Sequence, residues 1–190
     1  MSAPVNARVV LGISGASGAA LGLSVARQLA GLGAQVDLVT SMAAERTLAH
    51  ECGAGALDAL RQTVSRHHPI GDIGAAIASG SAPVAGMIVA PCSMRSLAAI
   101  AIGLDDNLLT RAASVQLKER RPLVLLAREA PLSLAHLRNM TRASEMGAII
   151  VPPVPAFYLA PRSVDEIINQ IAARAIDLLH IAKPIATAWQ

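Results

Sequence analysis

The chain of 190 residues is long enough for one domain with a full hydrophobic core, and 53% of its residues are hydrophobic while 15% are charged. Because so few charged residues cannot cover the surface of a domain, we expect apolar surface between the subunits of a homo-oligomer. The net charge of +3 is accompanied by only 2% aromatic residues, which argues against a nucleic-acid-binding protein and favours a small anion as the partner.

The first predicted element is a strand at Val9–Leu11, followed by the Gly- and Ser-rich turn Gly12–Gly18 and a helix that runs to Leu32. Gly15 and Gly18 lack a Cβ, so backbone N–H groups of this turn could approach a phosphate or the edge of a flavin. The positive end of the following helix would point to the same place. The alternative is a tight turn that only packs the helix against the strand.

The alternation of strand and helix continues to the end of the chain. Further strands are predicted at Gln35–Thr40, Gly86–Ala90, Pro122–Ala127 and Ala148–Val151. Helices are predicted from Ser41 to about His50, at Leu97–Ile102, Asn107–Lys118 and Ser133–Met146, and after a capping box at Ser163–Glu166. Residues 53–68 are predicted as a mixture of helix and loop. Short apolar strands alternating with helices predict an α/β protein with a parallel sheet covered on both sides, in a single domain spanning 1–190.

The longest uncharged stretch, 73–94, contains glycines and prolines, which indicate loop and buried strand instead of a membrane span. The short polar segment Met1–Arg8 precedes the first strand, so we predict no signal peptide and a cytoplasmic protein. Cys52 and Cys92 are too few for a disulfide framework or a thiolate metal site, and we expect both to be inert. The histidines show no metal-binding spacing, and His67 and His68 are expected on a surface connection.

Open parallel sheets bind ligands at the carboxyl ends of their strands. The segments that leave those ends are 12–18, 40–41, 91–96, 128–131 and 152–161, and all of them carry polar residues or residues of special geometry. The second strand ends without the acid that NAD would require, because Asp37 lies well inside it. The first turn also lacks the lysine of a nucleotide triphosphate loop and the Gly-x-Ser-x-Gly elbow of hydrolases. Ser14 and Ser17 are therefore hydroxyl donors to a ligand, or they satisfy the backbone of the turn.

Seven blocks, in order along the chain, carry a family resemblance: Gly12–Gly18, Ala78–Ser81, Ala90–Ser93, Leu109–Ala113, Leu117–Leu125, Arg128–Leu132 and Pro152–Tyr158. They resemble the UbiX-type flavin prenyltransferases, which supply prenylated FMN to partner decarboxylases. The similarity spans Val9 to Leu179. One departure is Ile73, which stands where some members of the family carry a tryptophan.

The resemblance implies a three-layer Rossmann- or flavodoxin-like fold, assembled into a dodecamer. It also implies an enzyme that joins the dimethylallyl group of dimethylallyl monophosphate to N5 and C6 of reduced FMN without a metal. By resemblance, the flavin nucleotide contacts Gly15, Ala16, Ser17, Ser41, Ser93, Met94, Arg95, Ser96 and Arg128. The prenyl phosphate is expected to contact Ser79, Arg111, Lys118, Tyr158 and Arg174, some of them from a neighbouring subunit, with Glu129 and Glu51 also at the site.

Cleavage of an allylic carbon–oxygen bond leaves negative charge on the phosphate, so cations and a phenol beside it stabilise the transition state. Arg111, Lys118, Arg174 and Tyr158 have this chemistry; otherwise they are solvated helix charges and an ordinary tyrosine. Ring closure also requires proton transfer, for which Glu129 ranks first and Glu51 or the released phosphate are alternatives. A salt bridge with Arg128 or Lys118 is the structural alternative for Glu129.

The segment Asp105–Asn107 is too short to be the Asp-rich magnesium motif of diphosphate-dependent prenyl chemistry, and it is expected to cap the next helix. Two other functions stay open. An FMN-dependent cysteine decarboxylase would show Pro-x-Ser-Ala-Asn and Pro-x-Met-Asn segments, whereas Pro91–Arg95 ends in Met-Arg and no Met-Asn pair follows. A non-catalytic flavin-binding subunit is the second. Whether the product serves ubiquinone synthesis or the decarboxylation of aromatic acids is also open.

Overall fold

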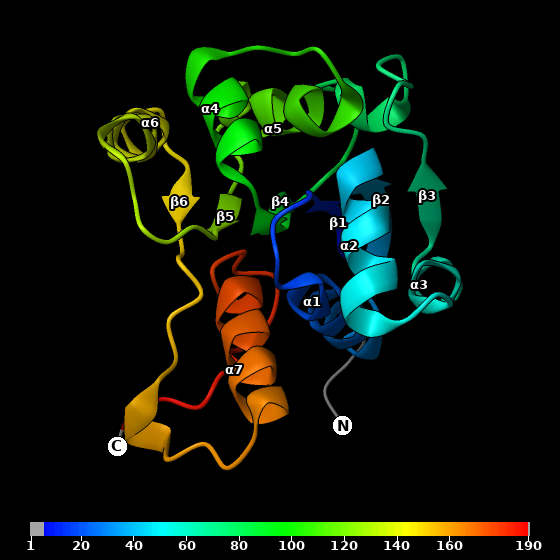
Figure 1. Ribbon diagram of the computed structural model, residues 1–190. Helices are drawn as coiled ribbons and strands as arrows, with labels where there is room; N and C mark the ends of the chain where they lie inside the picture. The colour runs from blue at the N-terminus through cyan, green and yellow to red at the C-terminus, as the bar shows by residue number, and fades with distance from the viewer. Residues whose placement is uncertain (1–5, 190) are drawn as a thin grey trace.

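A computed structural model describes residues 6–189 and shows a sheet of six parallel strands (Figure 1). The strands are β1 (Arg8–Ile13), β2 (Gln35–Thr40), β3 (Arg66–His68), β4 (Gly86–Cys92), β5 (Leu123–Ala127) and β6 (Ile149–Ile150). Their order across the sheet is β3-β2-β1-β4-β5-β6, which is the order of the Rossmann fold. The direction of winding reverses between β1 and β4, so the loops that follow these two strands are neighbours.

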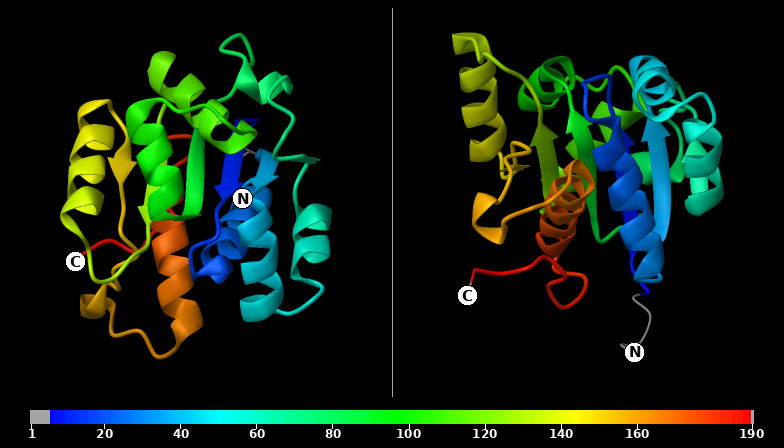
Figure 2. Two further views of the ribbon diagram at one scale, coloured as in Figure 1. Left: turned by 45° about the horizontal axis from the view of Figure 1, so that its top comes forward. Right: turned by 60° about the horizontal axis from the view of Figure 1, so that its bottom comes forward.

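Helices cover both faces of the sheet, and this confirms the predicted three-layer fold (Figure 2). The helices are α1 (Ala19–Gly31), α2 (Met42–Cys52), α3 (Ala56–Thr63), α4 (Met94–Ile102), α5 (Leu108–Lys118), α6 (Leu134–Glu145) and α7 (Val164–Asp177), with 3-10 turns η1 (Ala76–Ala78) and η2 (Phe157–Leu159). One core cluster joins the sheet to α1, α2, α3 and α7, and the other joins it to α4, α5 and α6.

The side chains of each central strand divide between these two cores. Val9, Leu11 and Ile13 of β1 pack into the core beneath α1 and α7, whereas Val10 packs into the core beneath α4 and α5. A strand buried on both faces needs apolar residues at every position, which explains the continuous apolar runs of the sequence.

The predicted helix ends are mostly confirmed, with two differences. Asn107 caps α5 by accepting the N–H of Thr110 at 3.1 Å, as expected. Helix α4 begins at Met94, earlier than the predicted Leu97, because Ser93 caps it. Ser163 accepts the N–H of Glu166 at 3.1 Å, but the Glu166 carboxylate accepts from Arg162, so the capping box is not reciprocal.

The expectation for residues 53–68 was incomplete, because their last residues form strand β3 at the edge of the sheet. The placement of His67 and His68 on a surface connection was wrong, because both lie in β3. His68 is 6% exposed, and its Nε2 lies 2.7 Å from Oδ1 of Asp37 in β2. Arg8 of β1 donates from Nε and Nη2 to the same carboxylate, at 2.5 and 3.0 Å. Burial alone would raise the pKa of Asp37, but the hydrogen bonds from Arg8 and His68 outweigh it and hold the pKa below its usual value.

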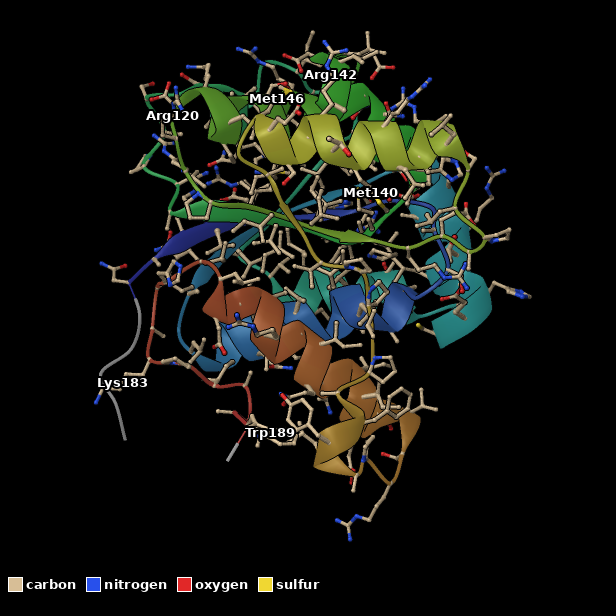
Figure 3. The ribbon with its side chains drawn as sticks, turned by 90° about the vertical axis from the view of Figure 1, so that its left-hand side faces the viewer. Arg120, Met140, Arg142, Met146, Lys183 and Trp189 are labelled. Carbon is tan, nitrogen blue, oxygen red and sulfur yellow. The ribbon has the colours of Figure 1, made fainter. Side chains whose placement is uncertain are left out.

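The segment after α7 folds back along that helix. The carboxylate of Asp177 accepts the N–H groups of Ile185 and Ala186 at 2.8 and 3.2 Å. The side chain of Gln170 exchanges two hydrogen bonds with the backbone of Thr187, at 2.9 and 3.1 Å. Figure 3 shows the layers of the molecule edge on, with Trp189 on the side of the sheet that α7 covers.

Cys92 is fully buried in β4, and burial raises the pKa of its thiol to about 12, as expected for an inert thiol. Within residues 6–189, no helix has both the length and the apolar character needed to cross a membrane.

Candidate functional site

The loops that follow β1 and β4 are joined at the point where the strand order reverses. The hydroxyl of Ser14 donates to the carbonyl of Pro91 at 2.9 Å and accepts the N–H of Ser93 at 2.7 Å. Ser14 is only 2% exposed. Of the two readings that the sequence left open for this residue, the structure supports the second: its hydroxyl satisfies the backbone of the turn and links the two loops.

A cavity of about 570 Å³ opens at this point of the sheet, and it is where five of the predicted flavin-binding residues meet. They are Gly15, Ser41, Ser93, Arg95 and Ser96. Ser41 is the N-cap of α2 and Ser93 is the N-cap of α4, so the positive ends of two helices face the cavity. A helix N-terminus favours phosphate, and the apolar side chains of Ile70 and Leu109 on the cavity wall suit an aromatic ring.

Gly15 is required by the close approach of the turn to α2. A Cβ built at Gly15 would lie 2.3 Å from the Cβ of Ala43, which no real pair of carbon atoms allows. Met94, the first residue of α4, is 8% exposed, and its side chain packs into the core. Of the predicted flavin residues, Met94 therefore has little besides its backbone to offer a ligand.

The N-terminus of α1 does not face the cavity with free amides, contrary to what the sequence suggested. Oε2 of Glu51, at the end of α2, accepts the N–H groups of Gly18 and Ala19, both at 2.8 Å. Burial alone would raise the pKa of Glu51, but hydrogen bonds from Ser17 and these two amides, with the charge of Arg128, hold the pKa below its usual value. The structure thus brings Ser17, Glu51 and Arg128 together, and it keeps Glu51 as an anion.

Glu129 lies in the exposed loop that leaves the carboxyl end of β5. Its Oε1 accepts the N–H of the next residue, Ala130, at 3.0 Å. Among residues 6–189 the structure records no ion pair between Glu129 and Arg128 or Lys118, the structural alternative raised for this residue. The carboxylate of Glu129 therefore accepts fewer hydrogen bonds than that of Glu51.

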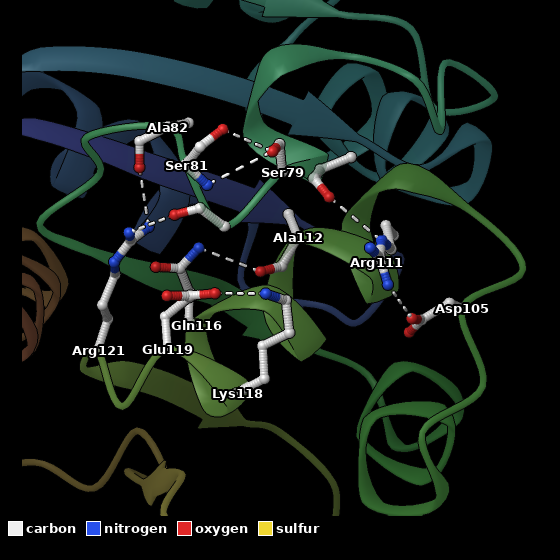
Figure 4. A network of polar contacts seen from close by, with 12 residues as sticks. Ser79, Ser81, Ala82, Asp105, Arg111, Ala112, Gln116, Lys118, Glu119 and Arg121 are labelled. Atoms are coloured by element: carbon white, nitrogen blue, oxygen red, sulfur yellow. Dashed lines mark hydrogen bonds and ion pairs between the residues drawn. The ribbon is translucent and has the colours of Figure 1, made fainter.

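Three of the predicted phosphate-binding residues form a second group along α5 (Figure 4). The guanidinium of Arg111 donates from Nε to the carbonyl of Ala78 at 3.2 Å, directly before Ser79 in the chain. At the other end of α5, a Cβ built at Gly80 would lie 2.5 Å from Nζ of Lys118, so the ammonium lies against the residue directly after Ser79. Lys118 also pairs with Glu119.

The remaining two predicted residues form a third group beside α7. Tyr158 and Arg174 line one cavity of about 450 Å³, which the segment after α7 helps to enclose. The ring of Tyr158 meets the ring of Trp189 edge to face, with 4.9 Å between their centroids. A larger cavity of about 610 Å³ between α1, α7 and η2 contains none of the predicted site residues.

The three groups are not assembled into one site by a single chain. The second group belongs to α5, on one face of the sheet, and the third belongs to α7 and η2, on the opposite face (Figure 1). The predicted flavin-binding residues lie at the carboxyl ends of the strands. The structure also shows a residue that the sequence did not single out for the site: Asp105, expected only as part of a helix cap, contacts Arg111. The sequence carries no local signal for this contact.

Comparisons with known proteins show which family the chain resembles along most of its length. The family model described as Flavoprotein matches residues 2–176. The chain is 50% identical over 183 residues to a flavin prenyltransferase UbiX of Neisseria meningitidis serogroup B, covering 96% of each protein. The crystal structure of AnUbiX (PadA1) in complex with FMN and dimethylallyl pyrophosphate superposes with a TM-score of 0.93 at 43% identity, covering 97% of this chain and 98% of that one. A dodecameric FMN-dependent UbiX-like decarboxylase from Escherichia coli O157:H7 gives 0.91 at 41% identity, covering 96% and 99%.

Proposed function

Because the chain belongs to the UbiX-type flavin prenyltransferases of the Flavoprotein family, we propose that it transfers a dimethylallyl group from dimethylallyl monophosphate to reduced FMN. The observation that carries the proposal is the cavity of about 570 Å³ at the switch point of the sheet, where hydroxyls and helix N-termini meet apolar side chains. These residues fit FMN, which has a phosphate at one end and an aromatic ring system at the other.

Ser41, Ser93 and Ser96, with the N-termini of α2 and α4, would hold the FMN phosphate, and Arg95 adds a positive charge at the cavity wall. Gly15, Ala16 and Ser17 would bring their backbone close to the flavin, and the chain around Met94 would do the same. Arg128, whose charge acts on Glu51, would contact the flavin from the β5 side. When bound, reduced FMN supplies the nucleophilic N5 and C6 positions.

The residues of the second and third groups would act on the leaving phosphate. Arg111 and Lys118 would neutralise the charge that develops as the allylic carbon–oxygen bond breaks, with Ser79 donating a hydroxyl. Arg174 would add a third cation, and Tyr158 would donate its phenolic proton to a phosphate oxygen. None of these interactions requires a metal ion.

Ring closure releases a proton at C6, and Glu129 is our first candidate to accept it. Glu129 lies at the carboxyl edge of the sheet, and its carboxylate accepts one hydrogen bond, from Ala130. Glu51 is the second candidate, although the two amides that bind its Oε2 make it a weaker base.

Because the second and third groups lie on opposite faces of one chain, the complete site requires more than one copy. We propose a homo-oligomer, a dodecamer as in the UbiX-like protein of E. coli, in which the η2 and α7 arm of one copy reaches the flavin cavity of another. Large apolar side chains exposed on this arm, such as Phe157 at 76% and Val164 at 71%, are consistent with burial between copies. We further propose that the enzyme works in the cytoplasm and that its product serves a prenylated-FMN-dependent decarboxylase.

The decisive experiment is to incubate the purified protein with reduced FMN and dimethylallyl monophosphate without oxygen, and to record the mass and the absorption spectrum of the flavin. We expect the mass of FMN plus one five-carbon unit. Bound FMN that keeps its mass would leave a non-catalytic flavin-binding subunit. Release of carbon dioxide from a peptidyl or pantothenoyl cysteine would instead indicate a cysteine decarboxylase.

A further inference from the structure

The guanidinium of Arg111 is held at two of its three nitrogens. Its Nε donates to the carbonyl of Ala78 at 3.2 Å, and its Nη1 donates to Oδ2 of Asp105 at 3.1 Å (Figure 4). Within residues 6–189 the structure records no protein acceptor for Nη2. The contacts of Nε and Nη1 therefore fix the plane of the guanidinium, and Nη2 remains available for an anion.

Asp105 is itself fixed at both oxygens. Oδ2 accepts from Arg111, and Oδ1 accepts the hydroxyl of Ser114 at 2.5 Å. Ser114 follows Arg111 by three residues on α5, so the two side chains lie on the same face of the helix. A carboxylate bound at both oxygens is held in one orientation, and the arginine that it binds is held in one orientation as well. Together, Asp105 and Ser114 form a clamp that ties the loop before α5 to the side chain of Arg111.

The other ion pairs of the predicted cations are less constrained. Lys118 pairs with Glu119, and Arg95 pairs with Asp106; these two basic side chains are 51% and 57% exposed, whereas that of Arg111 is 38% exposed and that of Asp105 is 26% exposed. Exposed pairs between flexible side chains fix little, because water and rotation compete with them. Glu119 is also adjacent to Lys118 in the chain, so this contact does not link separate segments.

We propose that Asp105, oriented by Ser114, is a positioning residue that pre-organises Arg111 for the phosphate of the prenyl donor. This proposal rests on the proposed function, in which Arg111 binds that phosphate. A free arginine side chain would lose rotational freedom about several bonds when it binds the donor. Because the clamp already restricts this rotation, less conformational entropy is lost on binding. The negative charge of Asp105 also weakens phosphate binding. The clamp therefore fixes the orientation of Arg111 at the expense of some affinity for phosphate, and the weaker binding favours release of the phosphate product.

The test measures steady-state prenylation at saturating reduced FMN with varied dimethylallyl monophosphate, together with inhibition by inorganic phosphate. Asp105→Ala should lower kcat/KM for the donor by about 10- to 100-fold, since small misplacements of a binding group can have effects of this size. Affinity for FMN and the unfolding midpoint should stay unchanged. Asp105→Asn should stay within about threefold of the wild type, because the amide can keep both hydrogen bonds. Its inhibition by inorganic phosphate should become stronger, because the negative charge is gone.

Ser114→Ala should change kcat/KM in the same direction as Asp105→Ala but less, and it decides the question if Asp105→Ala does not fold. Asp58→Ala, which removes an exposed ion pair with Arg61 on α3, is the matched control and should have no effect.

A double-mutant cycle separates positioning from a general structural role. If Asp105 acts only through Arg111, adding Asp105→Ala to Arg111→Ala should change kcat/KM no further. Fully additive losses would overturn the proposal, as would an Asp105→Ala enzyme with normal donor kinetics beside an impaired Arg111→Ala enzyme. In both cases the proposed function would stand. If Arg111→Ala itself left the donor kinetics unchanged, the assignment of Arg111 in the proposed function would fail, and this proposal with it.

Discussion

Oε2 of Glu51 lies 2.8 Å from the amide nitrogen of Gly18, so a carboxylate at the end of α2 caps the start of α1. The Rossmann fold commonly uses this helix terminus to bind a phosphate. In this protein a side chain supplies the negative charge instead, and the N-termini of α2 and α4 are the ones that face the flavin cavity.

Replacing Glu51 by Gln should lower the free energy of unfolding by about 0.5 to 1 kcal/mol at neutral pH, because it removes a charge from a helix N-terminus. The folded-state pKa of Glu51 lies below its ordinary value, so its stabilising contribution is present above about pH 4.5 and is lost as the pH falls through the folded pKa. Denaturant unfolding of both proteins at pH 7 and at about pH 3 checks this. A difference that did not shrink in acid would contradict the charge-based explanation.

Replacing Glu129 by Gln should lower the prenylation rate by about 100-fold or more, because a proton acceptor is removed, while the unfolding midpoint stays the same. Its side chain is exposed, and the one hydrogen bond that it makes among the described residues is with the N–H of Ala130, so it contributes little to stability. Single-turnover prenylation, with calorimetry on the same preparations, measures both quantities. Equal rates for the two proteins would show that Glu129 does not accept the proton, and would leave Glu51 or the released phosphate as the acceptor.

Replacing Asp37 by Ala should lower the free energy of unfolding by about 3 kcal/mol, because Arg8 and His68 would lose their common partner inside the sheet. Arg8 is 21% exposed and can reach water, which places the effect at the low end for a buried pair. Since the pKa of Asp37 is lowered by folding, this contribution is present above about pH 4 and is lost as the pH falls through the folded pKa. Asp58→Ala is the exposed control, with an expected loss below about 1 kcal/mol. Similar losses for both variants would show that burial of the Asp37 pair has no consequence.

Replacing Gly15 by Ala should weaken FMN binding, because the new Cβ would lie 2.3 Å from that of Ala43 and the turn must move away from α2. Gly31, at the end of α1, is the matched control, because a Cβ there meets nothing within 4 Å. Gly31→Ala should leave FMN binding unchanged and stabilise the protein by up to about 1 kcal/mol. Titration with FMN, followed by flavin fluorescence, compares the variants, and equal affinities would exclude the turn from the flavin site.

Replacing Tyr158 by Phe should lower kcat/KM for the prenyl donor by about 100-fold, because the phenol that donates to the phosphate is lost. The phenyl ring keeps its edge contact with Trp189, so the fold of the arm is preserved. Trp189→Phe, which keeps an aromatic neighbour, serves as the control. Donor kinetics and FMN affinity measure the effect, and unchanged turnover in Tyr158→Phe would remove this residue from the proposed site.

The sequence alone was sufficient to determine the parallel sheet, five of its six strands and the edge where we propose that the flavin binds. Apolar runs such as Pro122–Ala127 have the length and the continuity that a doubly covered strand requires, and Gly- and Ser-rich turns follow the strands of the flavin site. These signals are local, because each depends on a few consecutive residues.

Strand β3 could not be recognised in this way, because it is short and polar, and His68 belongs in a strand only when Asp37 and Arg8 lie beside it. The same reason applies to the site. Glu51 on the terminus of α1, Asp105 against Arg111, and the separation of Arg111 from Arg174 by the sheet all depend on contacts between distant segments. Such contacts arise only when the helices pack, so tertiary structure alone decided which charges meet and which lie on opposite faces of the sheet.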